Sequence, residues 1–510
     1  MTGRARKKIR SGRAARLATG QRAGEAASPA APGQSGGMYR PLSDGDVDAI
    51  IAAAFRLLDD LGMGDVPDAL ARRCIAEGAR INGHGRLSLP EVLVRRCIDR
   101  AAKSITLHGR DPSRTIELGG DTVHFGTGGA AVQVLDLETQ RYRPTTLADL
   151  ADLTRLVDTL GSISWFTRCC IARDIQEVDA LDINTAFALL KGTTKPVGTA
   201  FTVAAHVEPI VEMFDLALGR PGAFAEAPFC KAHISPIISP MRFGEDAVEV
   251  TEACIAQGVP ISCITAAQAG ATAPATPAAF LSQSLAETLA ALVMVNVFAP
   301  GYPMIFSNWP LVVDLRTGSF SGGGGETALL NAASAQVSNR LGLPSGIAAS
   351  MSDAKAVDAQ MGVEKGLTVL AAGLAGGNLV YECAGMTASL LGTSFEAFVL
   401  DDEMIAHVLR VLRGIEVTPE TLAHEAITAA VLGEGHFLGG ADTLAAMERD
   451  YFYPPTADRD EPRTWEENGA STAAERARDI VRDRLAHHDP KALDPTAEKH
   501  IRARYDIRLA

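Results

Sequence analysis

The sequence reads ISCIT at residues 261–265, PAAFLSQSLAETLAALVMVNV at 277–297 and MIFS at 304–307. The first and third runs are short, apolar and barely alternating, which is typical of strands that are buried on both faces. The run between them has the length of a helix. This strand–helix–strand order predicts two neighbouring parallel strands covered by one helix.

The same alternation extends along most of the chain, from about residue 120 to residue 415. Eight runs are strand candidates, at residues 132–137, 162–167, 197–203, 230–235, 261–265, 304–307, 346–350 and 379–382. Helical runs lie between them and after the last, at residues 147–160, 207–218, 245–257, 277–297, 327–341, 356–372 and 401–412. Eight such units favour a closed barrel over an open doubly wound sheet. We therefore predict an α/β fold, a (β/α)₈ TIM-type barrel over residues 119–415.

Further segments flank the predicted barrel. Apolar residues at helical spacing predict an N-terminal helical cap over residues 38–118. A charged, helical composition predicts a C-terminal helical extension over residues 416–510, whose last part wraps the outside of the barrel. Residues 1–37 carry eight Lys and Arg against Glu25 alone, so we expect a disordered basic tail, with an Arg-rich transit or docking segment as the alternative.

The composition argues against several classes of partner and location. The formal net charge is −13 despite the basic tail, whereas a nucleic-acid partner requires a basic surface. The most apolar stretch, residues 286–306, is interrupted by Asn296, Pro300 and Pro303, so we expect a buried helix and strand, not a membrane span. Eight cysteines without a C-x-x-C motif fit a reducing, cytoplasmic setting.

Polar side chains follow several of the predicted strands, where a barrel of this type places its reacting groups. They include Arg168, His233, Gln268, Asn308 with Trp309, Asp353 with Lys355, and Glu382. An unpaired polar atom in such a place costs about 1–3 kcal/mol if it is buried. We therefore expect these groups to be solvated, paired or used in function.

Ser352 is followed by four further hydrogen-bonding side chains up to residue 360, those of Asp353, Lys355, Asp358 and Gln360. A lysine in this place can form a Schiff base with a carbonyl substrate. The alternative is that Ser352 and Asp353 only cap the helix that follows. Asp353, Lys355 and Glu382 are our candidates for catalytic residues.

Two glycine-rich segments stand out, at residues 126–129 and 322–325. Neither matches a phosphate-binding motif. They are either flexible loop tips or places where the backbone approaches a ligand closely. In the second case Gly128 and Gly129 face the cofactor, and we add Asp358 and Gln360 to the candidates for this role.

A metal site is a further alternative, since Cys230 and His233 lie three residues apart and Cys263 or Cys383 can join them in a barrel mouth. Buried structural cysteines account for the same scattered pattern. We expect no tightly bound metal.

Several motifs resemble those of the trimethylamine methyltransferase family. They are GGAAVQVLDLET (128–139), TLADLADL (146–153), AGATAP (269–274), DLRTGS (314–319), LPS (343–345), SDAK (352–355) with Asp358 and Gln360, and GHFL (435–438). The resemblance runs from about residue 39 to the C-terminus. It implies a (β/α)₈ barrel that delivers a methyl group from a small methylated amine to the cobalt of a corrinoid carried by a partner protein. We also expect a homo-oligomer.

The founding members of that family carry pyrrolysine, whereas this sequence has only standard residues. The chain therefore resembles the branch without pyrrolysine, which acts on quaternary amines such as glycine betaine. A quaternary substrate implies an aromatic face for its cation, which Trp309 or Tyr381 can provide, while Trp165 and Phe306 are expected in the core. If the substrate bears a carboxylate, Arg168 or Arg316 can pair with it, with surface pairing as the alternative for both.

Two other readings of the barrel remain open on the sequence. One is a lyase or aldolase that uses Lys355 as a Schiff-base lysine. The other is a non-catalytic barrel that binds quaternary amines.

Overall fold

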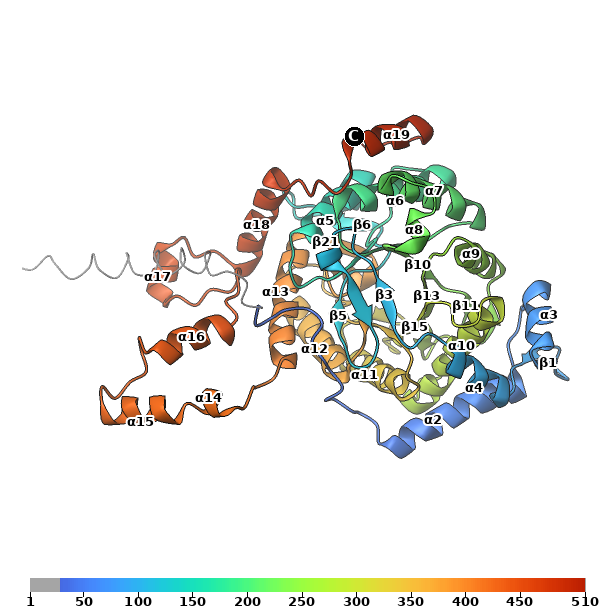
Figure 1. Ribbon diagram of the computed structural model, residues 1–510, viewed down its shortest axis with the longest axis horizontal. Coiled ribbons are helices and arrows are strands. Elements are labelled where there is room, and N and C mark those ends of the chain that lie inside the picture. The colour runs from blue at the N-terminus through green and yellow to red at the C-terminus, as the bar shows by residue number, and fades with distance from the viewer. Residues whose placement is uncertain (1–27, 510) are drawn as a thin grey trace, which may run out of the picture.

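The computed structural model describes residues 28–509, and at its centre lies an eight-stranded sheet whose neighbouring strands all run parallel (Figure 1). The strand order is β5–β19–β18–β15–β13–β10–β9–β8. The strands are β5 (His124–Phe125), β8 (Phe166–Thr167), β9 (Val197–Thr199), β10 (Cys230–Ile234), β13 (Ile261–Thr265), β15 (Met304–Asn308), β18 (Ser345–Ala348) and β19 (Leu379–Tyr381).

The two end strands of this order, β5 and β8, lie beside each other and close the sheet. Gly126, directly after β5, forms a parallel bridge with Trp165, directly before β8. The Ser164 amide also donates a hydrogen bond of 2.8 Å to the carbonyl oxygen of Phe125. The predicted eight-stranded barrel is therefore confirmed.

The first barrel strand is not the one expected from the sequence. The predicted run at 132–137 contains β6 (Gln133–Leu135), which lies outside the barrel in a four-stranded sheet with β7 (Tyr142–Pro144), β20 (Met386–Thr387) and β21 (Gly392–Ser394). The strand in the barrel is β5, only two residues long and followed by the glycine-rich segment. A strand this short has too few residues to produce a visible apolar pattern. The sequence pattern therefore indicates the longer run after it as the first barrel strand.

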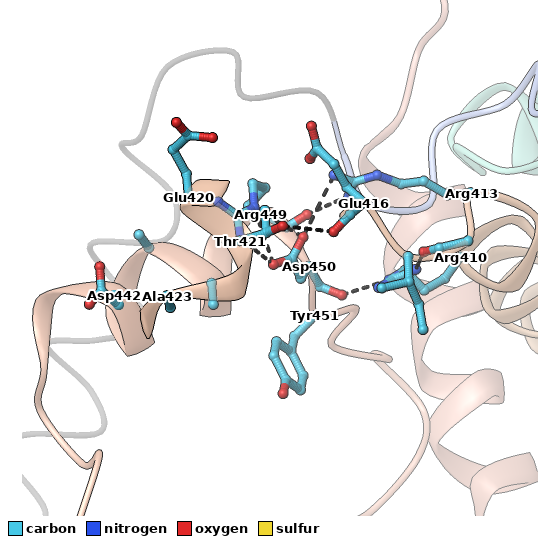
Figure 2. Close-up of a pocket in the computed structure, with 14 residues that line it drawn as sticks. Arg410, Arg413, Glu416, Glu420, Thr421, Ala423, Asp442, Arg449, Asp450 and Tyr451 are labelled. Carbon is cyan, nitrogen blue, oxygen red and sulfur yellow. Dashed lines mark hydrogen bonds and ion pairs between the residues drawn. The ribbon is translucent and has the colours of Figure 1, made fainter. Parts of the chain in front are cut away.

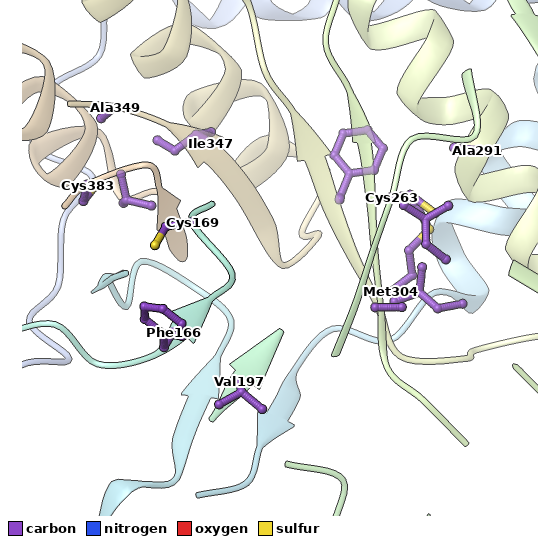
Figure 3. Close-up of a cluster of buried hydrophobic side chains, with 14 of the residues drawn as sticks. Phe166, Cys169, Val197, Cys263, Ala291, Met304, Ile347, Ala349 and Cys383 are labelled. Atoms are coloured by element: carbon purple, nitrogen blue, oxygen red, sulfur yellow. The ribbon is translucent and has the colours of Figure 1, made fainter. Parts of the chain in front are cut away.

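Helices surround the barrel as a ring (Figure 1). They are α5 (Leu147–Asp158), α6 (Val178–Gly192), α7 (Val207–Leu218), α9 (Glu245–Ala256), α10 (Pro277–Phe298), α11 (Gly325–Arg340), α12 (Ala359–Ala375) and α13 (Phe395–Leu412). Buried side chains of strands and helices form one continuous core, part of which Figure 3 shows with Cys263 and Met304 from the strands and Ala291 from α10.

Helix α10 is the one helix within residues 28–509 that is long and apolar enough to cross a membrane. In the structure 83% of its most apolar window is buried inside the protein. Packing in the barrel wall therefore accounts for its apolar sequence, as we expected.

The N-terminal part before the barrel contains helices and a hairpin. The helices are α2 (Asp44–Arg56), η1 (Leu57–Leu61), α3 (Asp68–Ala76) and α4 (Glu91–Arg100), and the hairpin joins β3 (Ile105–Leu107) to β4 (Ile116–Leu118). Leu107 and Leu118 of the hairpin belong to the same buried cluster as Ile264 and Ile305 of the barrel strands. The hairpin thus contributes its apolar face to the barrel interior.

The expected basic tail covers residues 1–37, of which 1–27 lie outside the described residues. Residues 28–37 are not disordered, because Ser35 pairs with Thr122 and the Gly36 amide donates a hydrogen bond to Asp121. The physical reason for this correction is that the backbone just before β5 forms hydrogen bonds with the extended segment.

The C-terminal part is helical, as predicted. It contains α14 (Pro419–Leu422), α15 (His424–Leu432), α16 (Ala441–Arg449), α17 (Pro462–Glu467), α18 (Ala473–His487) and α19 (Pro495–Arg504). Helix α18 is joined to α13 by the ion pair Arg478–Glu396 of 3.1 Å, and Tyr505 after α19 donates a hydrogen bond to the Pro209 carbonyl of α7. These last helices wrap the barrel, whereas α14 to α16 project away from it (Figure 1).

Candidate functional site

An aromatic cluster lies inside the barrel near the C-terminal ends of the strands. The ring of Tyr381 at the end of β19 lies 4.6 Å from Trp165 and 4.9 Å from Trp309, measured between ring centroids. His233 of β10 lies 5.5 Å from Trp309 and 5.8 Å from Tyr381. Three residues predicted for the site are thus brought together from three different strands or strand ends.

Lys231 is a further member of this cluster that the sequence reasoning missed. Its fully buried ammonium group lies 4.5 Å from the ring of Tyr381 and 4.8 Å from that of Trp165. It also donates a hydrogen bond of 2.9 Å to Thr167 Oγ1. Burial lowers its pKa to about 7. The signal was present in the sequence, because residues 231 and 233 alternate with apolar residues in one strand and so face the same side.

Four polar atoms around this cluster are buried without a hydrogen-bond partner within residues 28–509. They are His233 Nδ1, Asn308 Oδ1, Trp309 Nε1 and Glu382 Oε2. Buried polar groups are nearly always paired, so each unpaired one requires an explanation such as a ligand. All four belong to residues that the sequence predicted for the site.

The carboxylate of Glu382 is held against the glycine-rich segment after β5. A β-carbon on Gly128 would lie 2.8 Å from Glu382 Oε1, and one on Gly129 would lie 2.8 Å from Oε2. Glu382 itself has a left-handed backbone, with φ of 63°. Burial raises its pKa to about 8. The glycines therefore make room for this side chain, which explains why the segment lacks side chains of its own.

Arg168 follows β8 and lines a cavity of about 260 Å³ together with Asp182, Phe201 and Thr202. Asp182 accepts hydrogen bonds from the Thr202 backbone and hydroxyl and contacts His206 Nδ1 at 2.7 Å. The guanidinium of Arg168 has no hydrogen bond or ion pair in the part of the chain that the structure describes. Burial lowers the pKa of Arg168. Burial is also the main cause that lowers the pKa of His233, and the positive charge of Arg168 lowers it further.

The polar side chains of the segment after β18 form their hydrogen bonds with residues outside the aromatic cluster. Asp353 accepts hydrogen bonds from the Gly322 amide at 3.0 Å and from Ser389 at 2.9 Å. Lys355 is exposed and donates to the Asp353 carbonyl. The capping alternative is wrong for Ser352 and Asp353, since the N-cap of α12 is Asp358, which accepts a hydrogen bond from the Met361 amide.

The remaining predicted residues also lie outside the cluster. Gln360 is exposed and donates to Glu364. The Arg316 side chain is 88% exposed and paired with Asp314 at 2.8 Å, so it takes the surface-pairing alternative. Gln268 begins the short strand β14 (Gln268–Ala269), which pairs with β16 (Leu311–Val313) beyond the end of β13.

Cysteine does not assemble a metal site with His233. Residues 230 and 233 are an odd number of positions apart and so face opposite sides of β10. All eight cysteines are free and buried, and among residues 28–509 no three His, Cys, Asp or Glu side chains are grouped to hold a metal ion.

A larger cavity, of about 560 Å³, lies elsewhere, between the end of α13 and the projecting helices α14 and α16 (Figure 2). Arg410, Arg413, Glu416 and Asp450 give it a strongly polar lining. None of the predicted site residues lines it.

Comparison with known proteins identifies relatives of this chain. The chain is 28% identical to a glycine betaine methyltransferase of Desulfitobacterium hafniense, over 91% of this chain and 96% of the relative. It is 30% identical to a trimethylamine methyltransferase of Methanosarcina thermophila, over 79% of this chain and 83% of the relative. A solved structure of the monomethylamine methyltransferase of Methanosarcina barkeri matches with 12% identity and a TM-score of 0.43, covering 90% of this chain and 96% of that one. The model of the trimethylamine methyltransferase family matches residues 9–509, and the chain therefore belongs to that family.

Proposed function

We propose that this protein transfers a methyl group from a quaternary amine that bears a carboxylate, such as glycine betaine, to the Co(I) of a corrinoid held by a separate protein. The observation that carries the proposal is the buried pair of rings of Trp309 and Tyr381 together with the unpaired Oε2 of Glu382, the residue after Tyr381. The name of the glycine betaine relative supports the choice of substrate class.

The chemistry asks little of the protein in acid–base terms. A quaternary ammonium leaves as a neutral tertiary amine, because the electron pair of the broken N–C bond stays on nitrogen. The Co(I) acceptor supplies the electron pair of the new bond to the methyl carbon. The protein therefore has to desolvate the cation, orient one methyl group toward the acceptor and exclude water.

The aromatic cluster and Glu382 suit the cationic end of the substrate. Aromatic faces attract cations most strongly when the site is desolvated. In the structure two of these rings already contact the ammonium of Lys231. Glu382 Oε2 is unpaired in the same buried surroundings and carries a negative charge once the carboxyl ionises, at a pKa of about 8, so we assign Glu382, Trp309 and Tyr381 to the onium group.

Arg168 suits the other end of the substrate. A guanidinium binds a carboxylate through two parallel hydrogen bonds. That of Arg168 has no such bond within residues 28–509 and lines a cavity at the same end of the barrel. A carboxylate-bearing amine is therefore favoured over trimethylamine, which has no anionic group.

The test is methyl transfer from a panel of amines to free cob(I)alamin, followed by the change in its visible spectrum. Glycine betaine is expected to give methylcobalamin, tetramethylammonium to react more slowly and trimethylamine not to react. No methyl transfer from any member of the panel would overturn the proposal. Thermal stabilisation by glycine betaine without any methyl transfer would instead indicate a non-catalytic binding protein.

A further inference from the structure

Residues 415–453, here called the arm, form a part of the chain that has no core of its own. The arm contains α14, α15 and α16, and none of these three helices has a buried residue. Helices of four and nine residues are marginal in water when nothing packs against them. The arm therefore requires a surface that covers it.

The arm is fixed to the rest of the chain at its root by polar contacts. Arg410 Nε donates a hydrogen bond of 2.6 Å to the Asp450 carbonyl, and Arg413 lies 3.7 Å from the Asp450 carboxylate. Both arginines line the polar cavity at the root (Figure 2). From there the arm leads sideways, away from the ring of helices (Figure 1).

The far end of the arm is apolar and exposed. Leu432 is 82% exposed and Leu438 is 81% exposed, and Ile427, Val431 and Phe437 are also exposed. Eleven large apolar side chains of the arm are exposed in total. At on the order of 100 Å² each they present on the order of 1,000 Å² per copy, against about 800 Å² that each partner buries in a stable interface. Patches on monomers are usually smaller.

The same chain carries an apolar groove on the outside of the barrel, between α12 and α13. It has a volume of about 360 Å³ and is lined by Leu370, Met404 and Val408, among others. Leu367 and Val363 are exposed one and two helical turns before Leu370 on α12. Val411, close to the end of α13, also lines the groove, so the groove begins near the arm's root. The arm of the same chain nevertheless leads away from it (Figure 1).

We propose that the arm of one copy of this protein packs into the α12–α13 groove of a second copy, and that the second copy returns the same contact. A chain that displays both an apolar projection and an apolar groove forms a closed two-fold pair in this way. The sideways direction of the arm favours a second copy over the methyl acceptor, since the acceptor must reach the strand ends inside the ring. Only this comparison with the methyl acceptor rests on the proposed function; the match between the arm and the groove does not.

Sedimentation velocity on the full-length protein tests the proposal. The unchanged protein is expected to sediment as a dimer or a higher even-numbered assembly. Leu432→Glu in the arm and Leu367→Glu beside the groove should each shift it to a monomer without lowering the melting temperature of the barrel. Val92→Glu on α4 is the matched control, because Val92 is 74% exposed and lies outside both surfaces. A monomeric unchanged protein, or an assembly that neither variant weakens, would refute the proposal.

Disulfide trapping separates a second copy from an arm that folds back on its own groove. All eight native cysteines are buried, so an introduced cysteine is the accessible one. Chains with Leu432→Cys alone and Leu367→Cys alone, mixed and oxidised, should give a cross-linked pair of twice the chain mass. A cross-link that forms only within one chain carrying both substitutions would show a folded-back arm and exclude the exchange.

Discussion

Gly128 leaves the space that the Glu382 carboxylate occupies, since a β-carbon on Gly128 would lie 2.8 Å from Glu382 Oε1. Gly128→Ala must therefore displace this carboxylate, whose Oε2 is buried without a hydrogen-bond partner within residues 28–509. A misplacement of about 1 Å in an active site can cost on the order of 100-fold in rate. We predict a loss of this order in kcat/KM for glycine betaine, measured as methyl transfer to cob(I)alamin.

Gly325→Ala is the control for that variant. Gly325 begins α11, and a β-carbon there meets nothing within 4 Å. Its activity should equal that of the unchanged protein. Equal activity of the Gly128→Ala variant would show that the position of Glu382 does not matter for transfer.

The rings of Trp309 and Tyr381 give a second prediction. Trp309→Leu removes an aromatic face that attracts a buried cation. This cation–π interaction contributes up to about 2 kcal/mol to binding, which corresponds to roughly 30-fold in Kd. Tyr381→Phe keeps its ring and loses the hydroxyl, which donates a hydrogen bond of 2.8 Å to Ser262. Titration calorimetry with tetramethylammonium should therefore show weaker binding for Trp309→Leu and little change for Tyr381→Phe. Similar affinities for the two variants would argue against a cation at these rings.

The barrel could be predicted from the sequence because buried strands of four or five residues and long helices leave clear apolar patterns. The predicted helix at 207–218 has the bounds of α7, and the predicted strand at 261–265 has those of β13. Helix α6 was missed because Asp182 and Asn184 interrupt its apolar spacing. Both side chains are buried and form hydrogen bonds with residues elsewhere in the chain, Asp182 with Thr202 and Asn184 with Asp506. A sequence pattern does not show such tertiary contacts.

The site was predicted in part for a similar reason. His233, Asn308, Trp309 and Glu382 could be named as candidates because a barrel places strand ends at one mouth. Lys231 was missed because a lysine inside a strand is usually exposed, whereas here the aromatic rings shelter it. Lys355 and Gln360 were included for the density of polar groups around them, although both side chains are exposed, Lys355 in the loop after β18 and Gln360 in the first turn of α12.

The two buried ionisable groups of the site give a prediction of pH dependence. The pKa of Glu382 is raised to about 8 and that of Lys231 is lowered to about 7, both mainly by burial. As pH rises from 6 to 9, Lys231 loses a positive charge and Glu382 gains a negative one. A quaternary ammonium does not titrate, so both changes favour its binding. The Kd of tetramethylammonium should therefore fall as pH rises over this range.

Glu382→Gln and Lys231→Met are the variants that isolate the two groups. Each should flatten part of the pH profile, Glu382→Gln in the upper part and Lys231→Met in the lower part. Binding that weakens as pH rises would contradict the assignment of the cation to this cluster. Circular dichroism over the same range checks that each variant remains folded.

A buried ion pair joins Lys365 of α12 to Asp401 of α13 at 2.8 Å, and both side chains are almost fully buried. Lys365→Met leaves the Asp401 charge without its partner, which typically costs about 3–5 kcal/mol. Urea unfolding should show a loss of this size. Lys355→Met is the control, since Lys355 is exposed and should change stability little. Unchanged stability of Lys365→Met would mean that the pair contributes nothing to the fold.

Arg168 distinguishes a carboxylate-bearing substrate from a simple onium ion. Arg168→Gln removes the guanidinium that lines the cavity beside Asp182, and a charge-assisted hydrogen bond contributes about 1.5–3 kcal/mol. The KM for glycine betaine should rise roughly 10- to 100-fold on this basis, because 1.4 kcal/mol corresponds to a factor of about ten. The KM for tetramethylammonium, which has no carboxylate, should stay the same or fall. Arg316→Gln serves as the control, because Arg316 is exposed and already paired with Asp314. If Arg168→Gln raised both KM values equally, Arg168 would act on the shape of the site and not on a carboxylate.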